Sequence, residues 1–204
     1  MDVLLGLFLF CVLLNTGAAL ECEICSAMGS RTCTGRMKTC AAVEETCSNT
    51  LIEVSQDEQE FPVIIKGCAS FHKLITNQYY FTIGGGKIFR MSGVYCVGEA
   101  CKSALPELAP IQTKPNGKQC PACHSYTSTC PDEVVQCTGS QHYCFKSVSH
   151  SVIGYPDGLD VNILMKGCTT DALCDLLNLG KYLSLPGIGN HMAGECWPAK
   201  NTCQ

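Results

Sequence analysis

The chain has 204 residues, of which 18 are cysteines, and 14 basic against 18 acidic residues give it a formal charge of −4. Nucleic acids and anionic membranes select basic surfaces, so this charge argues against either as the main partner. The charge does not discriminate among protein partners.

The first segment, residues 1–19, is predicted to be a secretory signal peptide. Residues 3–14 form an apolar run, residues 16–19 are small or short, and the polarity changes abruptly at Glu21. A transmembrane anchor needs roughly 20 apolar residues, and this run is too short. No second apolar stretch follows, and the tail from Gly187 is mixed and polar. We therefore expect a secreted, extracellular protein without a membrane anchor.

The cysteine content indicates a disulfide scaffold. Cys11 leaves with the signal peptide, so 17 of the 18 cysteines remain in the mature chain. That density in a secreted chain is typical of small domains whose hydrophobic cores cannot hold the fold alone.

Two copies of one module follow each other. Six cysteine positions recur with an offset of 97 to 100 residues: Cys22, Cys25, Cys33, Cys40, Cys47 and Cys68, then Cys120, Cys123, Cys130, Cys137, Cys144 and Cys168. Lys66-Gly67-Cys68 likewise recurs as Lys166-Gly167-Cys168. This is an internal duplication, with domains at 20–102 and 118–204. The segment between them, 103–117, holds three prolines and no cysteine, which predicts an extended, semi-rigid linker.

Within each copy, β-rich runs flank turn residues and predict hairpins. The paired runs are 50–54 with 61–66, 78–83 with 87–91, and 143–153 with 159–166. The turns between them are the acidic tip 56–60, the three glycines 84–86, and residues 154–158. Residues 171–179 could form a short helix or a turn. The expected module is therefore a small, antiparallel all-β unit.

This cysteine spacing resembles the three-finger domain of the urokinase-receptor and lymphocyte-antigen family. The segments that carry the resemblance further are Cys22-Glu23-Ile24-Cys25, Val43-Glu44-Glu45-Thr46-Cys47, Leu51-Ile52-Glu53-Val54-Ser55, Lys166-Gly167-Cys168 and Lys114-Pro115-Asn116-Gly117-Lys118-Gln119-Cys120-Pro121. Two such domains in a soluble chain are similar to the gamma-type phospholipase A2 inhibitors of reptile plasma and their vertebrate relatives. The fold class implied is small all-β and disulfide-rich, with two tandem three-finger domains.

The resemblance also implies a disulfide pairing, which spacing alone leaves open because eight cysteines allow 105 connectivities. Carried over to this chain, the pairs are Cys22–Cys47, Cys25–Cys33, Cys40–Cys68, Cys96–Cys101, Cys120–Cys144, Cys123–Cys130, Cys137–Cys168 and Cys174–Cys196. The family's seventh and eighth cysteines are both missing from domain 1, where they would stand near Leu74 and at Tyr95.

Cys203 is left without a partner in its own module, because Trp197 stands where a ninth cysteine would be. An odd cysteine in a secreted protein indicates either an intermolecular bridge, as in a homo-oligomer, or a capped or tolerated unpaired thiol.

We expect no catalytic residue, no cofactor and no metal. Cys120-Pro121-Ala122-Cys123 looks like a redox motif but lacks the helix N-terminus that lowers a thiol pKa, so structural disulfides are expected there. The adjacent His124 is not expected to bind a metal, because Cys123 has a disulfide partner. The histidines show no metal-ligand spacing, and no nucleophile elbow or phosphate-binding loop occurs. A dispersed Ser/His/Asp triad stays open, although small cystine modules rarely bury the cavity that hydrolysis needs.

Binding surfaces are therefore the candidate functional sites. The first is the apolar part of the linker, Leu105, Pro106, Leu108, Pro110 and Ile111, because the resembled inhibitors carry a similar proline- and leucine-containing stretch there; packing between the domains is the alternative. The second is the turn at Tyr155 and Pro156. The third is the aromatic hairpin at 79–81 with Phe89, for which a role in the sheet core is the stronger alternative.

The resemblance implies a secreted inhibitor that binds secreted phospholipase A2 and blocks it sterically. The alternative is a secreted three-finger ligand or modulator of a cell-surface receptor, without phospholipase inhibition.

Overall fold

The computed structural model describes residues 19–70, 78–127, 129–153, 159–178, 183–185 and 189–202. Residues 1–18 of the predicted signal peptide, the turn 154–158 and Cys203 lie outside this part of the chain. The two α-helices within it, α2 (Ala100–Ser103) and α3 (Asp171–Asn178), are both too short to cross a membrane.

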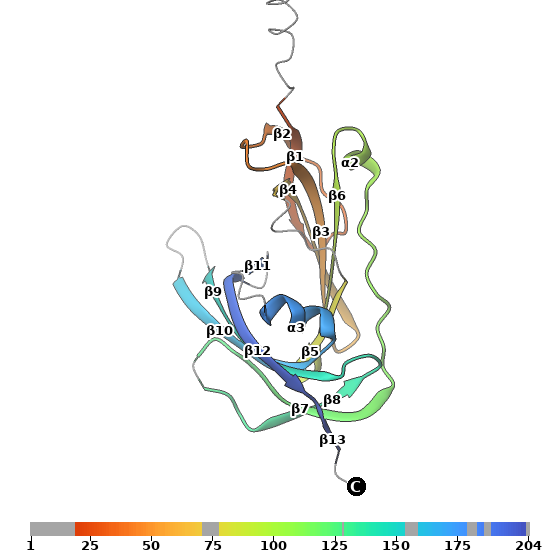
Figure 1. The fold of residues 1–204 in the computed structure, drawn as a ribbon, viewed down its shortest axis with the longest axis vertical. Helices are drawn as coiled ribbons and strands as arrows, with labels where there is room; N and C mark the ends of the chain where they lie inside the picture. Colours follow the sequence, from red (N-terminus) through yellow and green to blue (C-terminus); the bar gives the residue numbers. More distant parts are fainter. Residues whose placement is uncertain are drawn as a thin grey trace, which may run out of the picture.

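Each domain is a set of antiparallel strands, as the hairpin pattern predicts (Figure 1). Domain 1 contains β1 (Glu21–Met28), β2 (Arg36–Thr39), β3 (Thr46–Gln56), β4 (Gln59–Ala69), β5 (Tyr79–Ile83), the short 3₁₀ turn η2 (Gly84–Gly86), β6 (Lys87–Cys96) and α2. Domain 2 contains β7 (Pro115–Ser125), β8 (Glu133–Thr138), β9 (Tyr143–Ile153), β10 (Leu159–Thr169), α3, β11 (Leu183–Leu185), β12 (Gly189–Pro198) and β13 (Lys200–Asn201). The segment at 171–179 is thus a helix over most of its length.

The turn chemistry explains the two hairpins of domain 1. Asp57 and Glu58 both have positive φ, at 50° and 65°, which is the backbone of the two-residue turn that matches the twist of the flanking strands. Gly85 and Gly86, with φ of 71° and 66°, take the same left-handed region between β5 and β6, where glycine has no steric penalty.

Disulfides hold the strands of each domain together. The eight pairs are Cys22–Cys47, Cys25–Cys33, Cys40–Cys68, Cys96–Cys101, Cys120–Cys144, Cys123–Cys130, Cys137–Cys168 and Cys174–Cys196, the same pairs that the family resemblance implies. Two sets of three cysteines, one in each domain, lie close enough to suggest a metal site. All of them are in disulfides, so their sulfurs are oxidised and are not thiolate ligands.

The two domains share one sheet, which the sequence pattern does not predict. The strand order is β11-β12-β9-β10-β5-β6-β3-β4-β1-β2, so β5 of domain 1 lies beside β10 of domain 2. The antiparallel register places Ile83 opposite Gly167, Thr82 opposite Cys168 and Phe81 opposite Thr169.

One edge of β10 is divided between the two domains. Residues 164–166 pair with β7 of the same domain, and residues 167–169 pair with β5. In domain 1, residues 63–66 of β4 pair with β1 in the matching way, but among the described strands none pairs with Gly67–Ala69 on that side. In domain 2, Gly167 and Cys168 of the duplicated Lys-Gly-Cys segment therefore pair with β5 of domain 1.

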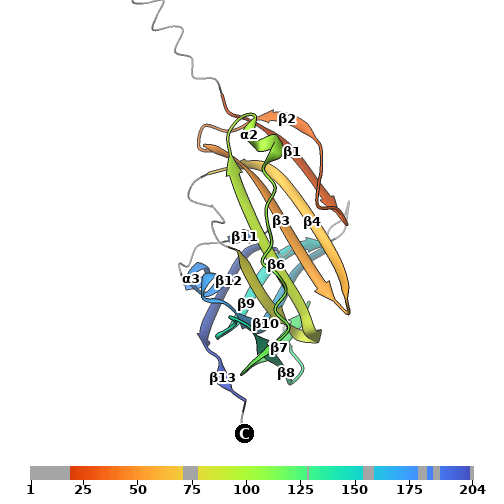
Figure 2. The ribbon, with the colours of Figure 1, turned by 90° about the vertical axis from the view of Figure 1, so that its right-hand side faces the viewer.

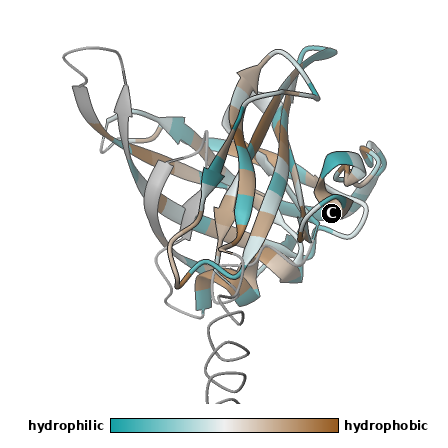
Figure 3. Cartoon of the chain, turned by 90° about the horizontal axis from the view of Figure 1, so that it is seen from above, coloured by the Kyte–Doolittle hydropathy of each residue, from teal (hydrophilic) through white to brown (hydrophobic). Residues whose placement is uncertain are grey.

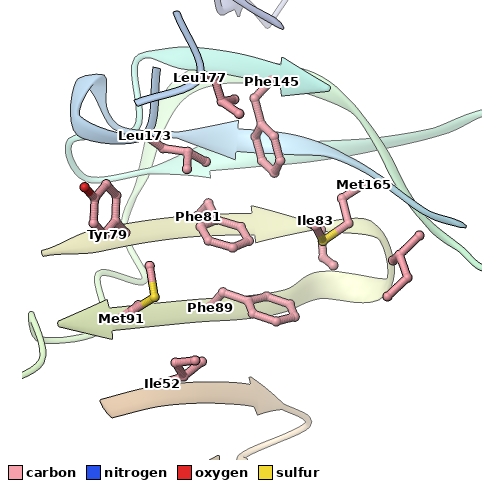
Figure 4. Packing of buried hydrophobic residues seen from close by; sticks show 11 residues of the cluster. Ile52, Tyr79, Phe81, Ile83, Phe89, Met91, Phe145, Met165, Leu173 and Leu177 are labelled. Atoms are coloured by element: carbon pink, nitrogen blue, oxygen red, sulfur yellow. The ribbon is translucent and has the colours of Figure 1, made fainter. Parts of the chain in front are cut away.

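A hydrophobic core lies across this junction. Domain 1 supplies Ile52, Tyr79, Phe81, Ile83, Phe89 and Met91, and domain 2 supplies Phe145, Ile163, Met165, Leu173 and Leu177, all of them buried. Figure 4 shows the two sets of side chains pointing toward one another. The ring of Phe81 is stacked on that of Phe89, with centroids 5.0 Å apart, and lies edge-on to that of Phe145, with centroids 5.4 Å apart. The aromatic hairpin is thus core and not an exposed binding surface.

The sheet of domain 1 has two different faces. Apolar and polar residues alternate along its strands (Figure 3), because successive side chains of a strand point to opposite faces. Ile52, Phe81 and Phe89 lie on the face toward domain 2, and the other face carries buried polar side chains such as Asn49 and Glu53.

A pair of glycine substitutions tests the junction. A Cβ added at Gly167 would lie 1.8 Å from the carbonyl oxygen of Thr82, whereas at Gly67 the nearest atom is 3.9 Å away. Neither glycine has a positive φ, so the two substitutions are expected to differ only in the steric clash of the added Cβ. We expect Gly167→Ala to lower the free energy of unfolding by about 2 kcal/mol or more and Gly67→Ala to change it by less than about 1 kcal/mol, as measured by urea unfolding with the disulfides intact. Equal effects of the two substitutions would contradict the shared sheet.

Candidate functional site

The linker lies along the polar face of domain 1 and does not hang free between the domains (Figures 1 and 2). Side chains of β3, β5 and β6, and one that precedes β5, hold its backbone carbonyls. The bonds are Asn49 Nδ2 to Ala104 O at 2.6 Å, Gln78 Nε2 to Glu107 O at 2.8 Å, Arg90 Nη1 to Ala109 O at 2.8 Å and Tyr80 Oη to Gln112 O at 2.9 Å. The predicted semi-rigid segment is therefore fixed along its length.

The apolar side chains of the linker differ in their exposure. Leu105 is 58% exposed, and Pro110 is exposed as well. Leu108 and Ile111 are half-buried, and Pro106 is buried. The linker is held by domain 1 over residues 104–112 and by domain 2 at its end, where Ser140 N–H donates to Gln112 Oε1 at 3.0 Å and Gly139 N–H donates to the Lys114 carbonyl at 3.1 Å. It presents a discontinuous apolar strip to solvent.

A buried charge cluster lies beneath the linker. Glu53 of β3 is fully buried and forms ion pairs with Arg31 and Arg90. Glu60 of β4 completes the cluster, 3.0 Å from Arg31 and 3.5 Å from Arg90. Burial lowers the pKa of Arg90, but a guanidinium stays charged in proteins. Arg90 thereby links the buried carboxylate to the Ala109 carbonyl of the linker.

The second candidate, the turn with Tyr155 and Pro156, lies outside the described residues, as does Cys203.

A groove between the domains is a feature that the sequence analysis does not single out. Its volume is about 240 Å³, and we call it the inter-domain groove. Domain 1 lines it with Val54, Gln56, Lys87 and Phe89, and domain 2 with His124, Tyr126, Ile163 and Met165. Lys87 and His124 come from different domains, and only the folded chain brings them together. No local sequence motif could therefore have identified the groove.

His124 is neutral in this groove. Its Nδ1 accepts a hydrogen bond from Lys87 Nζ at 3.0 Å. An ammonium group can only donate, so the ring keeps a lone pair on Nδ1 and its proton on Nε2. Burial, followed by the positive charge of Lys87, lowers the pKa of His124.

A larger cavity of about 750 Å³ lies at the opposite end of domain 1, beside β1, β2 and α2. Two of its lysines are already paired, Lys66 with Glu23 and Lys102 with Glu99, each at 2.8 Å. The hydrogen bonds from Lys66 and from the backbone of Gly35 lower the pKa of Glu23. The cavity is also lined by the exposed carboxylates of Glu21 and Glu45.

The family model for the u-PAR/Ly-6 domain matches this chain twice, at residues 18–104 and 116–203. The chain belongs to the u-PAR/Ly-6 domain family. The expected fold class is thereby confirmed, with two domains of this family, eight disulfides and mostly antiparallel strands.

Relatives over most of the chain carry inhibitor names. Phospholipase A2 inhibitor NAI of Notechis ater is 34% identical over 179 residues, which cover 86% of each chain. Phospholipase A2 inhibitor 25 kDa subunit of Naja kaouthia is 34% identical over 183 residues, covering 88% of this chain and 95% of the relative. A phospholipase A2 inhibitor gamma subunit from Gloydius brevicaudus siniticus is 32% identical over 176 residues, covering 83% of this chain and 86% of the relative. The resemblance to this group of family members is confirmed.

Among solved structures, mouse TEX101 aligns at 20% identity over 89% of this chain and 99% of that chain. Its TM-score of 0.39 is too low to support an inference.

Removing the charge of Glu53 tests the cluster beneath the linker. Glu53→Gln leaves two arginines beside a neutral, fully buried side chain, and breaking a buried pair in this way costs about 3–5 kcal/mol of unfolding free energy. Glu60→Gln is the matched control, because its side chain is 47% exposed and should cost about 1 kcal/mol or less. Denaturant unfolding measures both. A cluster that contributes little would give similar, small losses.

A dependence on pH follows from His124. Its folded-state pKa lies below the value of about 6.5 in the unfolded chain, so below that pH the unfolded state binds more protons. The free energy of unfolding should therefore fall as the pH drops below about 6.5 and level off once the folded-state pKa is passed. The loss that comes from Glu23 begins lower, below its ordinary value of 4.5.

His124→Gln should remove the loss that begins near pH 6.5, and His142→Gln, at an exposed site, should keep it. Urea unfolding at several pH values between 5 and 7.5 measures both variants. Retention of the full loss in His124→Gln would assign the titration to another group.

Proposed function

We propose that this chain is a secreted, non-enzymatic protein that binds a secreted phospholipase A2 and inhibits it by steric occlusion. The observation that carries the proposal is the 32–34% identity, over more than four-fifths of the chain, to proteins named phospholipase A2 inhibitors. Secretion is supported by the eight disulfides, since such bonds form and persist in oxidising compartments.

The linker is the surface that we propose for the contact with the enzyme. Leu105 and Pro110 project into solvent, and the partly exposed Leu108 and Ile111 continue the apolar strip. Four side chains already hold the backbone in place, so little conformational entropy is lost when a partner binds. Occlusion of this kind involves no covalent step and no cofactor.

The decisive experiment is inhibition of a panel of secreted phospholipases A2 by the purified, oxidised protein, with direct binding measured in parallel. We expect saturable inhibition at near-stoichiometric ratios. Absence of both binding and inhibition across the panel would reject the proposed function.

A charge substitution in the linker tests the contact surface separately. We expect Leu105→Asp to weaken inhibition about tenfold or more, because it places a charge in an apolar contact. Val134→Asp is the matched control, because Val134 is 60% exposed and Leu105 is 58% exposed. Unchanged inhibition by the Leu105→Asp variant would show that the linker is not the contact surface, and the inhibitor function itself would still stand.

A further inference from the structure

The duplicated module ends differently in the two domains. In domain 2 the chain runs from β12 into β13, which pairs with the start of β7 and places Lys200 opposite Gln119 and Asn201 opposite Lys118 (Figure 1). In domain 1 the chain after β6 turns at Gly98, which has a positive φ of 63°, into the short helix α2. Among the described strands, only β2 pairs with the start of β1, so the side that β13 takes on β7 has no strand on β1.

The cavity of about 750 Å³ in domain 1 lies at this position. The cysteine repeat makes Glu21 the equivalent of Gln119, and the strand registers make Val97–Glu99 the equivalent of Pro198–Lys200, which lead into β13. Glu21 and Val97–Glu99 all line the cavity, which we call the β1 slot. Its volume is within the range of about 300–1,000 Å³ that is typical of ligand sites. The slot therefore has the position and the size for a short extended segment.

The backbone of Glu21 is directed into the slot. The carbonyl of Leu20 accepts a hydrogen bond from the N–H of Cys40 at 2.8 Å, on the β2 side of the strand. Backbone groups of successive residues point to opposite sides of a strand, so the N–H and C=O of Glu21 point away from β2. The matching side of β7 faces β13, where the Gly117 carbonyl accepts from the N–H of Thr202 at 2.8 Å. Glu21 thus offers the same donor and acceptor to a strand from outside the domain.

The slot has an excess of negative charge. Its charged lining residues are Glu21, Glu23, Glu45, Glu99, Lys66 and Lys102. The two lysines are ion-paired with Glu23 and Glu99, whereas Glu21 and Glu45 have no ion-pair partner among the described residues. Removal of the predicted signal peptide adds the α-ammonium of Leu20, and four carboxylates then still exceed three cations. A strand in the slot is therefore favoured by a Lys or Arg opposite Glu21.

The rest of the lining suits a peptide. Met37 and Val97 are 57% and 60% exposed, so they present carbon surface that a ligand can cover. Asn49 is 2% exposed and donates to the carbonyls of Cys101 and Ala104 at 3.2 and 2.6 Å, and no described residue donates to its Oδ1. The slot thereby combines apolar contacts with a free acceptor, as the mixed side chains of a peptide require.

We propose that the β1 slot binds an extended, basic segment of another protein, which pairs with the start of β1 as β13 pairs with the start of β7. A Lys or Arg of this segment lies opposite Glu21, as Lys200 lies opposite Gln119. Main-chain hydrogen bonds supply the affinity, and the cross-strand charge pair supplies the preference for a basic residue. The proposal does not rest on the inhibitor function, because it follows from the two copies of the module.

Calorimetric titration of the oxidised, mature chain with a blocked peptide of the sequence Trp197–Thr202, in the absence of phospholipase, tests the slot. The probe is chosen because its backbone pairs with the equivalent edge of domain 2. We expect one saturable site per chain, and about fivefold weaker binding of a peptide with glutamate in place of the lysine. No saturable binding, or equal binding of the two peptides, would overturn the proposal.

Substitutions in the chain localise the peptide. Glu21→Lys should weaken binding of the lysine peptide about fivefold and should strengthen binding of the glutamate peptide. Asp132→Lys, at an exposed carboxylate outside the slot, should leave both unchanged. Thermal unfolding of each variant verifies that it is folded. If Glu21→Lys did not reverse the preference between the peptides, the slot would be the wrong site.

Backbone methylation of the peptide distinguishes strand pairing from charge attraction alone. A methyl group on the lysine nitrogen removes the donor to the Glu21 carbonyl and should weaken binding about fivefold. On the following asparagine nitrogen, which points away from β1, it should have little effect. Equal effects would exclude the strand arrangement. Self-association of the chain that Glu21→Lys abolishes, without binding of the peptide, would identify a second copy as the occupant and would also overturn the proposal.

Discussion

The pairing of β5 with β10 is the constraint on which the rest of the structure depends. It joins two disulfide-linked modules into one sheet, and it brings the apolar face of domain 1 against domain 2. Without it, the core residues Phe81 and Phe145 would each face solvent. The buried amide of Gln141 donates a hydrogen bond to Thr82 Oγ1 at 2.9 Å, and separation of the domains would break this bond. A buried amide without a hydrogen-bond partner lowers the free energy of unfolding.

The two faces of the domain 1 sheet divide its tasks. The apolar face builds the junction and the inter-domain groove, while the polar face holds the linker through Asn49, Arg90 and Tyr80. Glu53 is buried on the polar face and orients Arg90, so the path of the linker depends on a charge that lies far from it in the sequence. The linker and the inter-domain groove are thus positioned by the same sheet.

Much of this organisation could be predicted from the sequence, for identifiable reasons. The cysteine spacing repeats because equivalent disulfides link equivalent strands in the two domains. Turn residues such as Asp57 and Gly85 indicate the hairpins directly. The junction could not be predicted, because the apolar sequence of a strand such as 79–83 does not indicate whether the neighbouring strand belongs to the same domain or to the other one. The groove and the buried charge cluster depend on residues that only the folded sheet brings together, such as Lys87 with His124 and Glu53 with Arg31.

The division of the β10 edge has a consequence for each domain as an independent unit. Domain 1 produced by itself would present β5 as an open strand edge, and domain 2 would present residues 167–169 of β10 in the same state. Unpaired edges flanked by apolar side chains are templates for self-association. Such a fragment could recover its missing neighbour only from a second molecule, through exchange of equivalent elements between copies. In the intact chain the duplication supplies that neighbour within one polypeptide, and so keeps both edges closed.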